Sequence, residues 1–256
     1  MSRITAGVLA CDNENTIRRC LESVSWADER LVILDDRSTD ATAEISRTIG
    51  ARVLVNRFEN FAQQRNYGFD HTGTEWLFYI DSDEEATTAL GEEIRGVVHT
   101  PGYTGWWVPR RNLIWGRETR HGGWYPDYQL RLYRVDSARY DPEHPVHEVV
   151  QLEGQSGYLR EPLIHHNYTT MQQFRAKQQQ YVELEAGIRL RAGVRPRPWT
   201  IVSQPLREFW RYYVRLQGYR DGLHGLRLCA LVAYYYGYAV TARLTQMIKE
   251  QRSNTR

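Results

Sequence analysis

The chain has 256 residues, of which 41% are hydrophobic and 25% are charged, and its formal net charge is +2. This length supports one ample core or one domain with an appendage, and the nearly balanced charge gives no field that would attract nucleic acid. The three cysteines form no C-x-x-C pair, which excludes a disulfide framework and a cysteine zinc site and favours a reducing compartment. No apolar run is long enough for a signal peptide or a transmembrane span, so neither is expected.

Residues 1–100 alternate between strand-like and helix-like segments. Strands are expected at 4–10, 30–35, 51–55 and 75–81, and helices at 16–24, 38–50, 60–73 and 88–98. Asp40 is expected to cap the second helix, and Gly50 to follow its end. Strands separated by helices indicate right-handed crossovers and a mostly parallel sheet, which is the α/β class.

The pattern changes after residue 100. Residues 105–134 are rich in Trp, Arg and Gly and contain short strand-like pieces, which is typical of a functional excursion rather than of another β-α-β unit. Residues 171–193 favour a helix, the sequence RPRP at 195–198 marks a boundary, and residues 206–248 favour aromatic, basic helices.

A D-x-D pair follows the fourth predicted strand, with Asp81 and Asp83 on either side of Ser82. In parallel sheets, ligands bind beyond the carboxyl ends of the strands. Two carboxylates at this spacing can share Mg²⁺ or Mn²⁺, which commonly bridges protein oxygens to a diphosphate and offsets charge on a leaving phosphate. A solvated loop is the alternative, and Glu84 and Glu85 could equally start the next helix.

Other polar residues are expected at the same edge of the sheet. Asp35 and Asp36 end the second strand, where a carboxylate can accept hydrogen bonds from a base imide or from ribose hydroxyls; the following STDAT also fits a helix cap, and the two interpretations are compatible. A nucleotide with its metal would fill this crevice. The remaining candidates for nucleotide binding are Asn13, Glu14, Arg65, Asn66, Asp81 and Ser82.

A series of motifs now carries a family resemblance: NENTI, LDDRSTDAT, FAQQRN, IDSDE, PRR, GRETRHGGWYPDYQLRLYR, VHE and IHHNY. Their order resembles glycosyltransferase family 2, in particular the lipopolysaccharide core β-1,4-glucosyltransferases. That branch often has Asp-Ser at Asp35-Asp36 and commonly Asp-Ala-Asp at residues 81–83, which leaves the donor and acceptor open. The resemblance implies a GT-A fold, Rossmann-like with a mostly parallel sheet flanked by helices, followed by a helical C-terminal extension.

The resemblance also implies an inverting reaction with a UDP-sugar donor and a divalent cation, Mg²⁺ or Mn²⁺. In-line displacement at the anomeric carbon needs a base on the acceptor hydroxyl. Asp127 matches the family's catalytic carboxylate, and the neighbouring residues 124–126 could desolvate it and raise its pKa. A structural pair of Asp127 with Arg131 is the alternative.

Acceptor residues are expected in two motifs. Arg110 and Arg111 would hold a phosphate of donor or acceptor, or would lie at an exposed strand end. In the second motif, His121, Gly122 and Gly123 would form a turn near the acceptor, with Trp124 as a platform for a sugar; a plain glycine-rich turn is the alternative.

Two histidine motifs complete the candidate site. One of His165 and His166 would complete the metal or diphosphate site, as a histidine does in several GT-A enzymes, or would be structural. His147 and Glu148 would order a loop and are assigned no chemistry.

The tail, residues 206–250, combines aromatic and basic side chains that suit an in-plane helix on an anionic membrane. A helical pair that caps the catalytic domain, or a homodimer, fits the tail equally well. The residues concerned are Trp210, Arg211, Tyr212, Tyr213, Arg215, Arg220, Arg227, Tyr234, Tyr235, Tyr236 and Arg243.

The favoured function is transfer of a hexose, glucose from UDP-glucose, to a saccharide acceptor that is lipid-linked or part of a lipopolysaccharide core. Residues 1–100 would form the nucleotide-sugar half of one GT-A domain and residues 101–170 its acceptor half, and residues 171–256 would form the extension. The protein would lie on the cytoplasmic face of the membrane. The alternatives are a capsule, glycolipid or peptide acceptor, or a non-catalytic saccharide or nucleotide-binding module. A nucleotidyltransferase would need a phosphate loop, and a dehalogenase-type phosphatase a D-x-D on strand one; neither pattern occurs.

Overall fold

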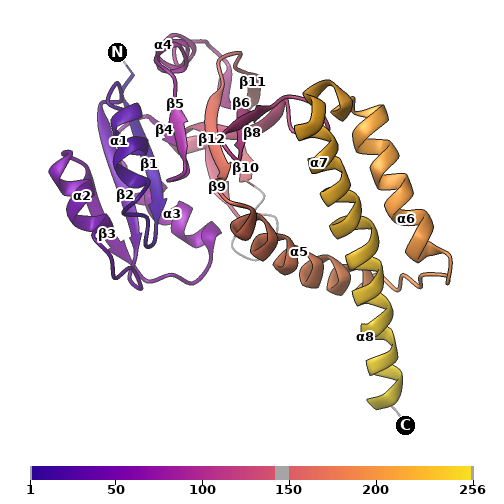
Figure 1. The fold of residues 1–256 in the computed structure, drawn as a ribbon. Coiled ribbons are helices and arrows are strands. Elements are labelled where there is room, and N and C mark those ends of the chain that lie inside the picture. The colour runs from indigo at the N-terminus through magenta and orange to yellow at the C-terminus, as the bar shows by residue number, and fades with distance from the viewer. Residues whose placement is uncertain (1, 142–149, 255–256) are drawn as a thin grey trace. The chain divides into compact units, whose positions relative to one another are not determined.

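The computed structural model describes residues 2–141 and 150–254, which excludes the predicted loop residues His147 and Glu148. The chain divides into two compact units (Figure 1). The first unit is Met1–Arg111 with Asp127–His165, and the second is Asn112–Pro126 with His166–Arg256.

The first half of the sheet is parallel. Its strands are β1 (Ile4–Ala10), β2 (Glu29–Asp35), β3 (Arg52–Asn56) and β4 (Trp76–Tyr79), in the order β3-β2-β1-β4. The helices between them are α1 (Ile17–Ser23), α2 (Thr42–Thr48) and α3 (Phe61–His71). The predicted β-α-β alternation is therefore confirmed.

The second half of the sheet is mainly antiparallel. Beyond β4 the order continues through β8 (Asp127–Arg134), β6 (Tyr103–Ile114), β12 (Leu163–Tyr168) and β5 (Glu84–Ala86). Two further strands pair with β6: β7 (Arg117–Thr119) is antiparallel to it, and β11 (Gln155–Tyr158) is parallel to it. A separate two-stranded sheet is formed by β9 (Ala138–Tyr140), which follows the 3₁₀ turn η1 (Val135–Ser137), and β10 (Val150–Leu152). The α/β fold class is confirmed, with residues 105–134 supplying strands of this half.

Two local expectations are corrected. Glu84 and Glu85 do not start a helix but lie in β5, and α4 (Thr88–Val97) begins after Thr87, whose hydroxyl accepts the Leu90 N–H at 3.1 Å. Asp40 is not the N-cap residue of α2, which is Ala41. It lies one residue earlier and accepts the Thr42 N–H at 2.9 Å. The end of α2 is as expected, because Gly50 follows it at φ 82°.

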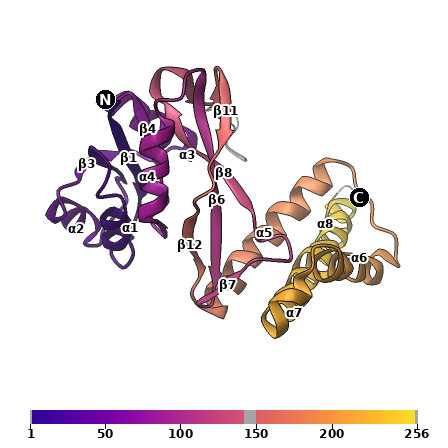
Figure 2. The same cartoon turned by 90° about the horizontal axis from the view of Figure 1, so that it is seen from above.

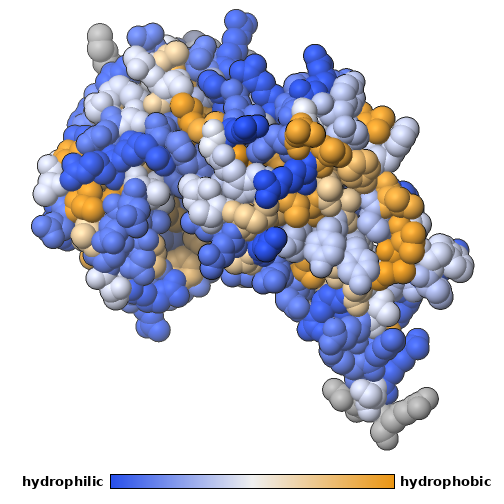
Figure 3. All heavy atoms as spheres, in the orientation of Figure 1, coloured by the Kyte–Doolittle hydropathy of each residue, from blue (hydrophilic) through white to orange (hydrophobic). Residues whose placement is uncertain are grey.

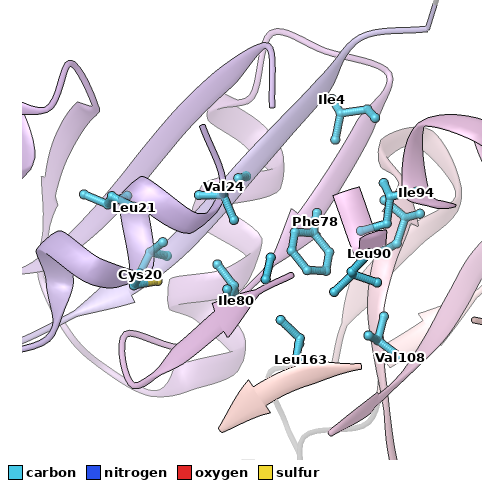
Figure 4. Close-up of a cluster of buried hydrophobic side chains, with 14 of the residues drawn as sticks. Ile4, Cys20, Leu21, Val24, Phe78, Ile80, Leu90, Ile94, Val108 and Leu163 are labelled. Carbon is cyan, nitrogen blue, oxygen red and sulfur yellow. The ribbon is translucent and has the colours of Figure 1, made fainter. Parts of the chain in front are cut away.

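Strand alternation builds two apolar layers on the parallel strands. Even-numbered residues of β1 and β2, such as Val8 and Val32, face α1 and α4, and Figure 4 shows this cluster around Phe78. Odd-numbered residues of β2, Leu31 and Ile33, face Phe69 of α3 on the other side. Burial on both faces explains why these strands are continuous apolar runs.

The second unit is helical, as predicted for the C-terminal part. It contains α5 (Met171–Arg191), α6 (Thr200–Phe209), α7 (Gly222–Val232) and α8 (Val240–Asn254) (Figure 2). Between these helices lie the π-helical turns η2 (Trp210–Arg215) and η4 (Ala233–Ala239) and the 3₁₀ turn η3 (Gly218–Asp221). Phe174 of α5 packs on Leu228 and Tyr235, and Ala186 packs on Val240 and Leu244. Within the described ranges, no helix combines the length and hydropathy that a membrane crossing requires.

Candidate active site

The loops that follow β1 and β2 are hydrogen-bonded to each other. Asp12, at φ 51°, accepts the Asp40 N–H through Oδ1 at 3.3 Å. The Asn13 N–H donates to the Thr42 hydroxyl at 2.7 Å, and the Glu14 N–H donates to Asp40 Oδ2 at 2.9 Å. Asn13 and Glu14 therefore lie where two parallel strands end, and their backbone fixes the shape of that edge.

Asp35 and Asp36 occupy different environments although they are adjacent. Asp35 is 4% exposed, and Arg37 donates to it from its backbone N–H and Nε, both at 2.9 Å, and from Nη2 at 2.5 Å. These hydrogen bonds from Arg37 outweigh the effect of burial and lower the pKa of Asp35 to about 2. Asp36 is exposed and accepts the Phe58 N–H at 3.3 Å.

A network of alternating charges surrounds the end of β4. Arg131, on β8, donates to Asp81 from Nη1 at 3.1 Å and also from Nη2, while Arg65 Nη2 lies 3.8 Å from Asp81 Oδ1. Burial alone would raise the pKa of Asp81, but Arg131 and then Arg65 hold it well below its usual range. Asp81 is therefore a carboxylate.

Glu84 is the centre of this network and is completely buried. Its Oε1 accepts from Arg131 Nη2 at 3.0 Å and from Arg110 Nη1 at 3.3 Å, and its Oε2 accepts the Asp81 N–H at 2.9 Å. Burial, reinforced by the Asp81 charge, raises the pKa of Glu84 above its usual range in spite of both arginines. A charge in such a place is tolerated only because its partners are charged and hydrogen-bonded.

Asp127 lies at the far end of the same network. Arg110 donates to its Oδ2 from Nε at 2.9 Å and from Nη2 at 2.6 Å, and Gln129 Nε2 donates to its Oδ1 at 2.9 Å. Asp127 is thus paired with Arg110, while Arg131, the partner considered from the sequence, binds Asp81 and Glu84. We call Asp81, Arg131, Glu84, Arg110 and Asp127 the charge network.

Asp83 and His165 approach each other beside the charge network. His165 Nε2 lies 3.5 Å from Asp83 Oδ2; the imidazole is buried, whereas the carboxylate is 40% exposed. His165 is opposite Glu84 in the β5–β12 ladder. Because successive strand side chains point to opposite faces, His166 points away from the side on which His165 meets Asp83.

The divalent cation that the family implies can be tested against these groups. Among the described residues, no three metal-ligating side chains converge. Asp83 and His165 still fit, because Mg²⁺ and Mn²⁺ are commonly held by one or two protein groups together with substrate phosphates and water. Asp81 is less suited to direct ligation, since its oxygens already accept from Arg131.

Arg65 and Asn66, both on α3, have different contacts. The Arg65 guanidinium lies 5.2 Å from the Tyr140 ring centre and near Asp81. Asn66 makes two hydrogen bonds with the Tyr140 backbone, donating at 2.8 Å and accepting at 2.9 Å. Asn66 therefore fastens β9 to α3, while Arg65 faces the charged groups. Ser82 lies in the turn between Asp81 and Asp83, half-buried.

The sequence model described as "Glycosyl transferase family 2" matches residues 5–166, which contain both strand-end edges and the charge network. The chain belongs to glycosyltransferase family 2. This transferase is 29% identical over 255 residues to the lipopolysaccharide core biosynthesis glycosyltransferase LpsC of Rhizobium meliloti (strain 1021), covering 95% of this chain and 92% of the relative. An uncharacterized glycosyltransferase of Rickettsia typhi is 30% identical over 94 residues, which is 37% of this chain and 32% of the relative.

The solved structures that match include a glucosyl-3-phosphoglycerate synthase from Mycobacterium tuberculosis in complex with Mn²⁺, UDP and glucosyl-3-phosphoglycerate. It is 16% identical, with a TM-score of 0.49, and the match covers 76% of this chain and 81% of that one. For mannosyl-3-phosphoglycerate synthase from Rubrobacter xylanophilus the identity is 19% and the TM-score 0.39, over 43% of this chain and 41% of that one. The transferase therefore spans less than half of the latter structure, and the family assignment depends on the sequence match.

The predicted acceptor motif of the transferase lies in the second unit. His121 Nδ1 is 2.7 Å from Asp221 Oδ1, and the His121 N–H donates to Oδ2 at 2.9 Å. Gly122 and Gly123 both have positive φ, 66° and 81°, so the turn requires residues without a Cβ. Trp124 is partly buried against the cluster around Phe174. Arg111 is half-buried and ends the first segment of the first unit.

Three residues of the candidate site were not among the predicted site residues: Glu84, Arg131 and Arg37. Glu84 and Arg131 were each noticed in the sequence, as a possible helix start and as a structural partner. Their joint position became visible only once β5 and β8 were placed. Arg37 had a local signal, since an arginine two residues after a carboxylate can fold back onto it.

Proposed function

We propose that this transferase is inverting and metal-dependent, and that it moves glucose from UDP-glucose to a saccharide acceptor. The observation that carries the proposal is the charge network, which links the D-x-D turn to Asp127 through Glu84 and two arginines. A fixed relation between the donor's leaving group and a carboxylate base is what an in-line displacement needs.

In this proposal the edge formed by β1 and β2 binds the nucleoside. Asp35 and Asp36 would accept hydrogen bonds from the base and the ribose, with the joined loops at Asn13 and Glu14 as the floor. Asp83 and His165 would hold Mg²⁺ or Mn²⁺, which, when bound, stabilises the negative charge of the departing UDP. Arg65, close to Asp81, would face the diphosphate.

Asp127 is the proposed base. Arg110 donates twice to Oδ2, which holds the carboxylate in one orientation. Oδ1, the other oxygen, accepts a hydrogen bond from Gln129, and a carboxylate held in this way would take the proton of an acceptor hydroxyl. Arg110 thus acts as a positioning residue that orients the base.

The proposed acceptor is a saccharide that is lipid-linked or part of a lipopolysaccharide core. Support comes from the printed name of the Rhizobium meliloti relative and from the length over which the two chains align. Arg111, His121, Gly122, Gly123 and Trp124 remain the proposed acceptor residues, and the cytoplasmic face of the membrane remains the proposed location.

Turnover of nucleotide sugars tests the proposal. Purified protein is incubated with UDP-glucose and with other nucleotide sugars, with Mg²⁺, Mn²⁺ or EDTA, and with and without lipopolysaccharide core acceptors; release of UDP and the anomeric configuration of the product are measured. We expect metal-dependent transfer from UDP-glucose with inversion, lost in Asp127→Asn. Titration calorimetry of UDP with Mn²⁺ runs alongside, because a non-catalytic saccharide-binding module would ignore both.

Three outcomes contradict parts of the proposal. Equal turnover in EDTA would contradict the proposed metal dependence, and retention of the anomeric configuration would contradict the single displacement. Transfer only to capsule, glycolipid or peptide acceptors would contradict the proposed acceptor class.

A further inference from the structure

A row of exposed apolar side chains runs along α6 and its continuation η2. Trp199, Val202, Leu206 and Trp210 are 61–65% exposed, and Val214 is 37% exposed. They recur every three or four residues, so they share one face of the helix. Figure 3 shows hydrophobic surface gathered over α6. We call these five residues the apolar stripe.

A line of arginines runs beside the apolar stripe. Arg207, Arg211 and Arg215 each follow a stripe residue directly, and all three are exposed. Arg207 donates to the neutral Gln204, and Arg211 lies 3.8 Å from Glu208. Glu208 is the only acidic residue between positions 199 and 215, and its side chain is 14% exposed. The outer surface of this helix is therefore apolar and positive.

The opposite side of α6 is the side that packs within the second unit. A Cβ added to Gly237 of η4 would lie 2.4 Å from Pro205 Cα, which shows how closely the two helices approach. The apolar stripe is therefore on the side of α6 that no other described element of the second unit covers.

We infer that the apolar stripe and Arg207, Arg211 and Arg215 dock this chain on a membrane surface rich in anionic phospholipid, with α6 lying in the plane of the membrane. Apolar side chains enter the boundary between headgroups and acyl chains, the two tryptophans lie at headgroup level, and the arginines reach lipid phosphates. The inference extends the proposed function, because a lipid-linked acceptor would be met at such a surface.

Charge complementarity favours a membrane over a second copy of the chain. A symmetric dimer through the same face would add three arginines to the three already present, whereas anionic lipid neutralises them. Both an apolar and an electrostatic contribution are available for lipid, and together they make binding stronger than either alone.

The surface differs from the one expected from the tail sequence. Tyr235 is buried at 8% exposure in the core with Phe174, and Arg243 binds Glu183 of α5 at 2.8 Å. Both therefore serve packing of the second unit. Trp199 and Val202, which precede the expected segment, contribute instead.

Flotation of the full-length protein with liposomes tests the inference. We expect it to rise with vesicles of phosphatidylcholine and phosphatidylglycerol at low salt, to rise less at high salt, and to remain at the bottom with pure phosphatidylcholine. The triple variant Arg207→Gln, Arg211→Gln, Arg215→Gln should bind anionic vesicles about 100-fold more weakly. The double variant Leu206→Ser, Trp210→Ser should lose a similar factor, about 100-fold.

Matched controls come from exposed residues of the first unit. Arg3→Gln, Arg47→Gln and Arg160→Gln together remove the same charge, and Val55→Ser with Tyr158→Ser removes comparable exposed apolar area. Both control proteins should float like the parent. All variants should keep the parent's circular dichroism and melting temperature, since none of the substituted side chains is buried.

Three results would overturn the inference: a parent protein that stays at the bottom of the gradient, controls that bind as weakly as the stripe variants, or stripe variants that change a dimer into a monomer in light scattering without any lipid binding. The last result would assign the stripe to contact between copies. Flotation does not depend on turnover, so a protein that floats but transfers no sugar would contradict the proposed function and leave this inference standing.

Discussion

The two acidic clusters at the strand ends, Asp35-Asp36 after β2 and Asp81-Ser82-Asp83-Glu84 after β4, look alike in sequence and differ in their surroundings. Asp35 is neutralised by Arg37, two residues away, whose side chain is 63% exposed. Glu84 and Asp81 are neutralised by arginines on β6 and β8, which are nearly buried. The first cluster is a local turn, where the proposed nucleoside site lies. The second is held by residues far apart in the sequence, which fix the strands and the proposed catalytic groups together.

The largest effect is expected at Asp83, the carboxylate of the second cluster that lies beside His165. Asp83→Ala should slow transfer roughly a thousandfold or more, because a lost metal ligand removes several kcal/mol of stabilisation from the leaving group. Steady-state rates are measured over a range of Mn²⁺ concentration. Asp36→Ala, an exposed aspartate of the first cluster, is the comparison; as a proposed nucleoside contact it should weaken donor binding and leave the Mn²⁺ dependence of the rate unchanged. Equal losses in both variants would erase the functional difference between the clusters.

The end of the charge network should matter nearly as much. Asp127→Asn keeps the shape and the hydrogen bond to Gln129 but removes the proton acceptor, so turnover should fall by about 10²–10⁴-fold while UDP affinity is retained. Single-turnover kinetics and calorimetry separate the two. If Asp127→Asn transfers sugar at the parent rate, the base lies elsewhere.

The contrast between buried and exposed pairing can be sharpened with two adjacent residues. Glu84→Gln removes the carboxylate that Arg131 and Arg110 share. Arg131 keeps Asp81 and Arg110 keeps Asp127, so the loss of the charged hydrogen bonds should cost about 1.5–3 kcal/mol. Glu85, 2.6 Å from Arg19, is partly exposed, and Glu85→Gln should cost about 0–1 kcal/mol. Urea unfolding of both variants measures the difference; similar midpoints would show that the network is not a stabilising element.

A smaller effect on stability than at Glu84 is expected for the local pair of Asp35 and Arg37. The folded pKa of Asp35, about 2, lies below its unfolded value near 4, so the pair stabilises the fold above that unfolded value and loses its effect as pH falls from about 4 to 2. Since Arg37 is largely exposed, the contribution should be about 1 kcal/mol. Unfolding of Asp35→Asn should lack this acid dependence, and its UDP affinity should fall by about 10–150-fold. An unchanged UDP affinity would leave the pair only a structural role.

Local features of the fold could be predicted from the sequence, and long-range contacts could not. The parallel strands, their helices and the position of both clusters at strand ends depend on local periodicity, and the structure confirms them. The partners of Glu84 come from residues 26 and 47 positions away, through antiparallel pairing that no local pattern encodes. β5 has three residues, too few to show a period, so its glutamates resembled a helix start.

The same limit applies to the C-terminal helices. Aromatic residues there recur densely, and their composition alone does not say which face is turned inward. Packing decides that Tyr235 is core and Leu206 is surface. Helix content could be predicted, but the orientation of each helix could not.

The β5–β12 ladder sets His165 opposite Glu84 and Leu163 opposite Ala86. Strand side chains alternate with a period of two, so a slip of β12 by one residue would put His166 opposite Glu84 and turn His165 to the other face. The pairing register of β12 on β5, which follows the short link between Tyr158 and Leu163, therefore decides which histidine faces Asp83. A register shift of one residue would turn His165 away from Asp83, while a shift of two residues would keep His165 on its face but set Leu163 or Asn167 opposite Glu84.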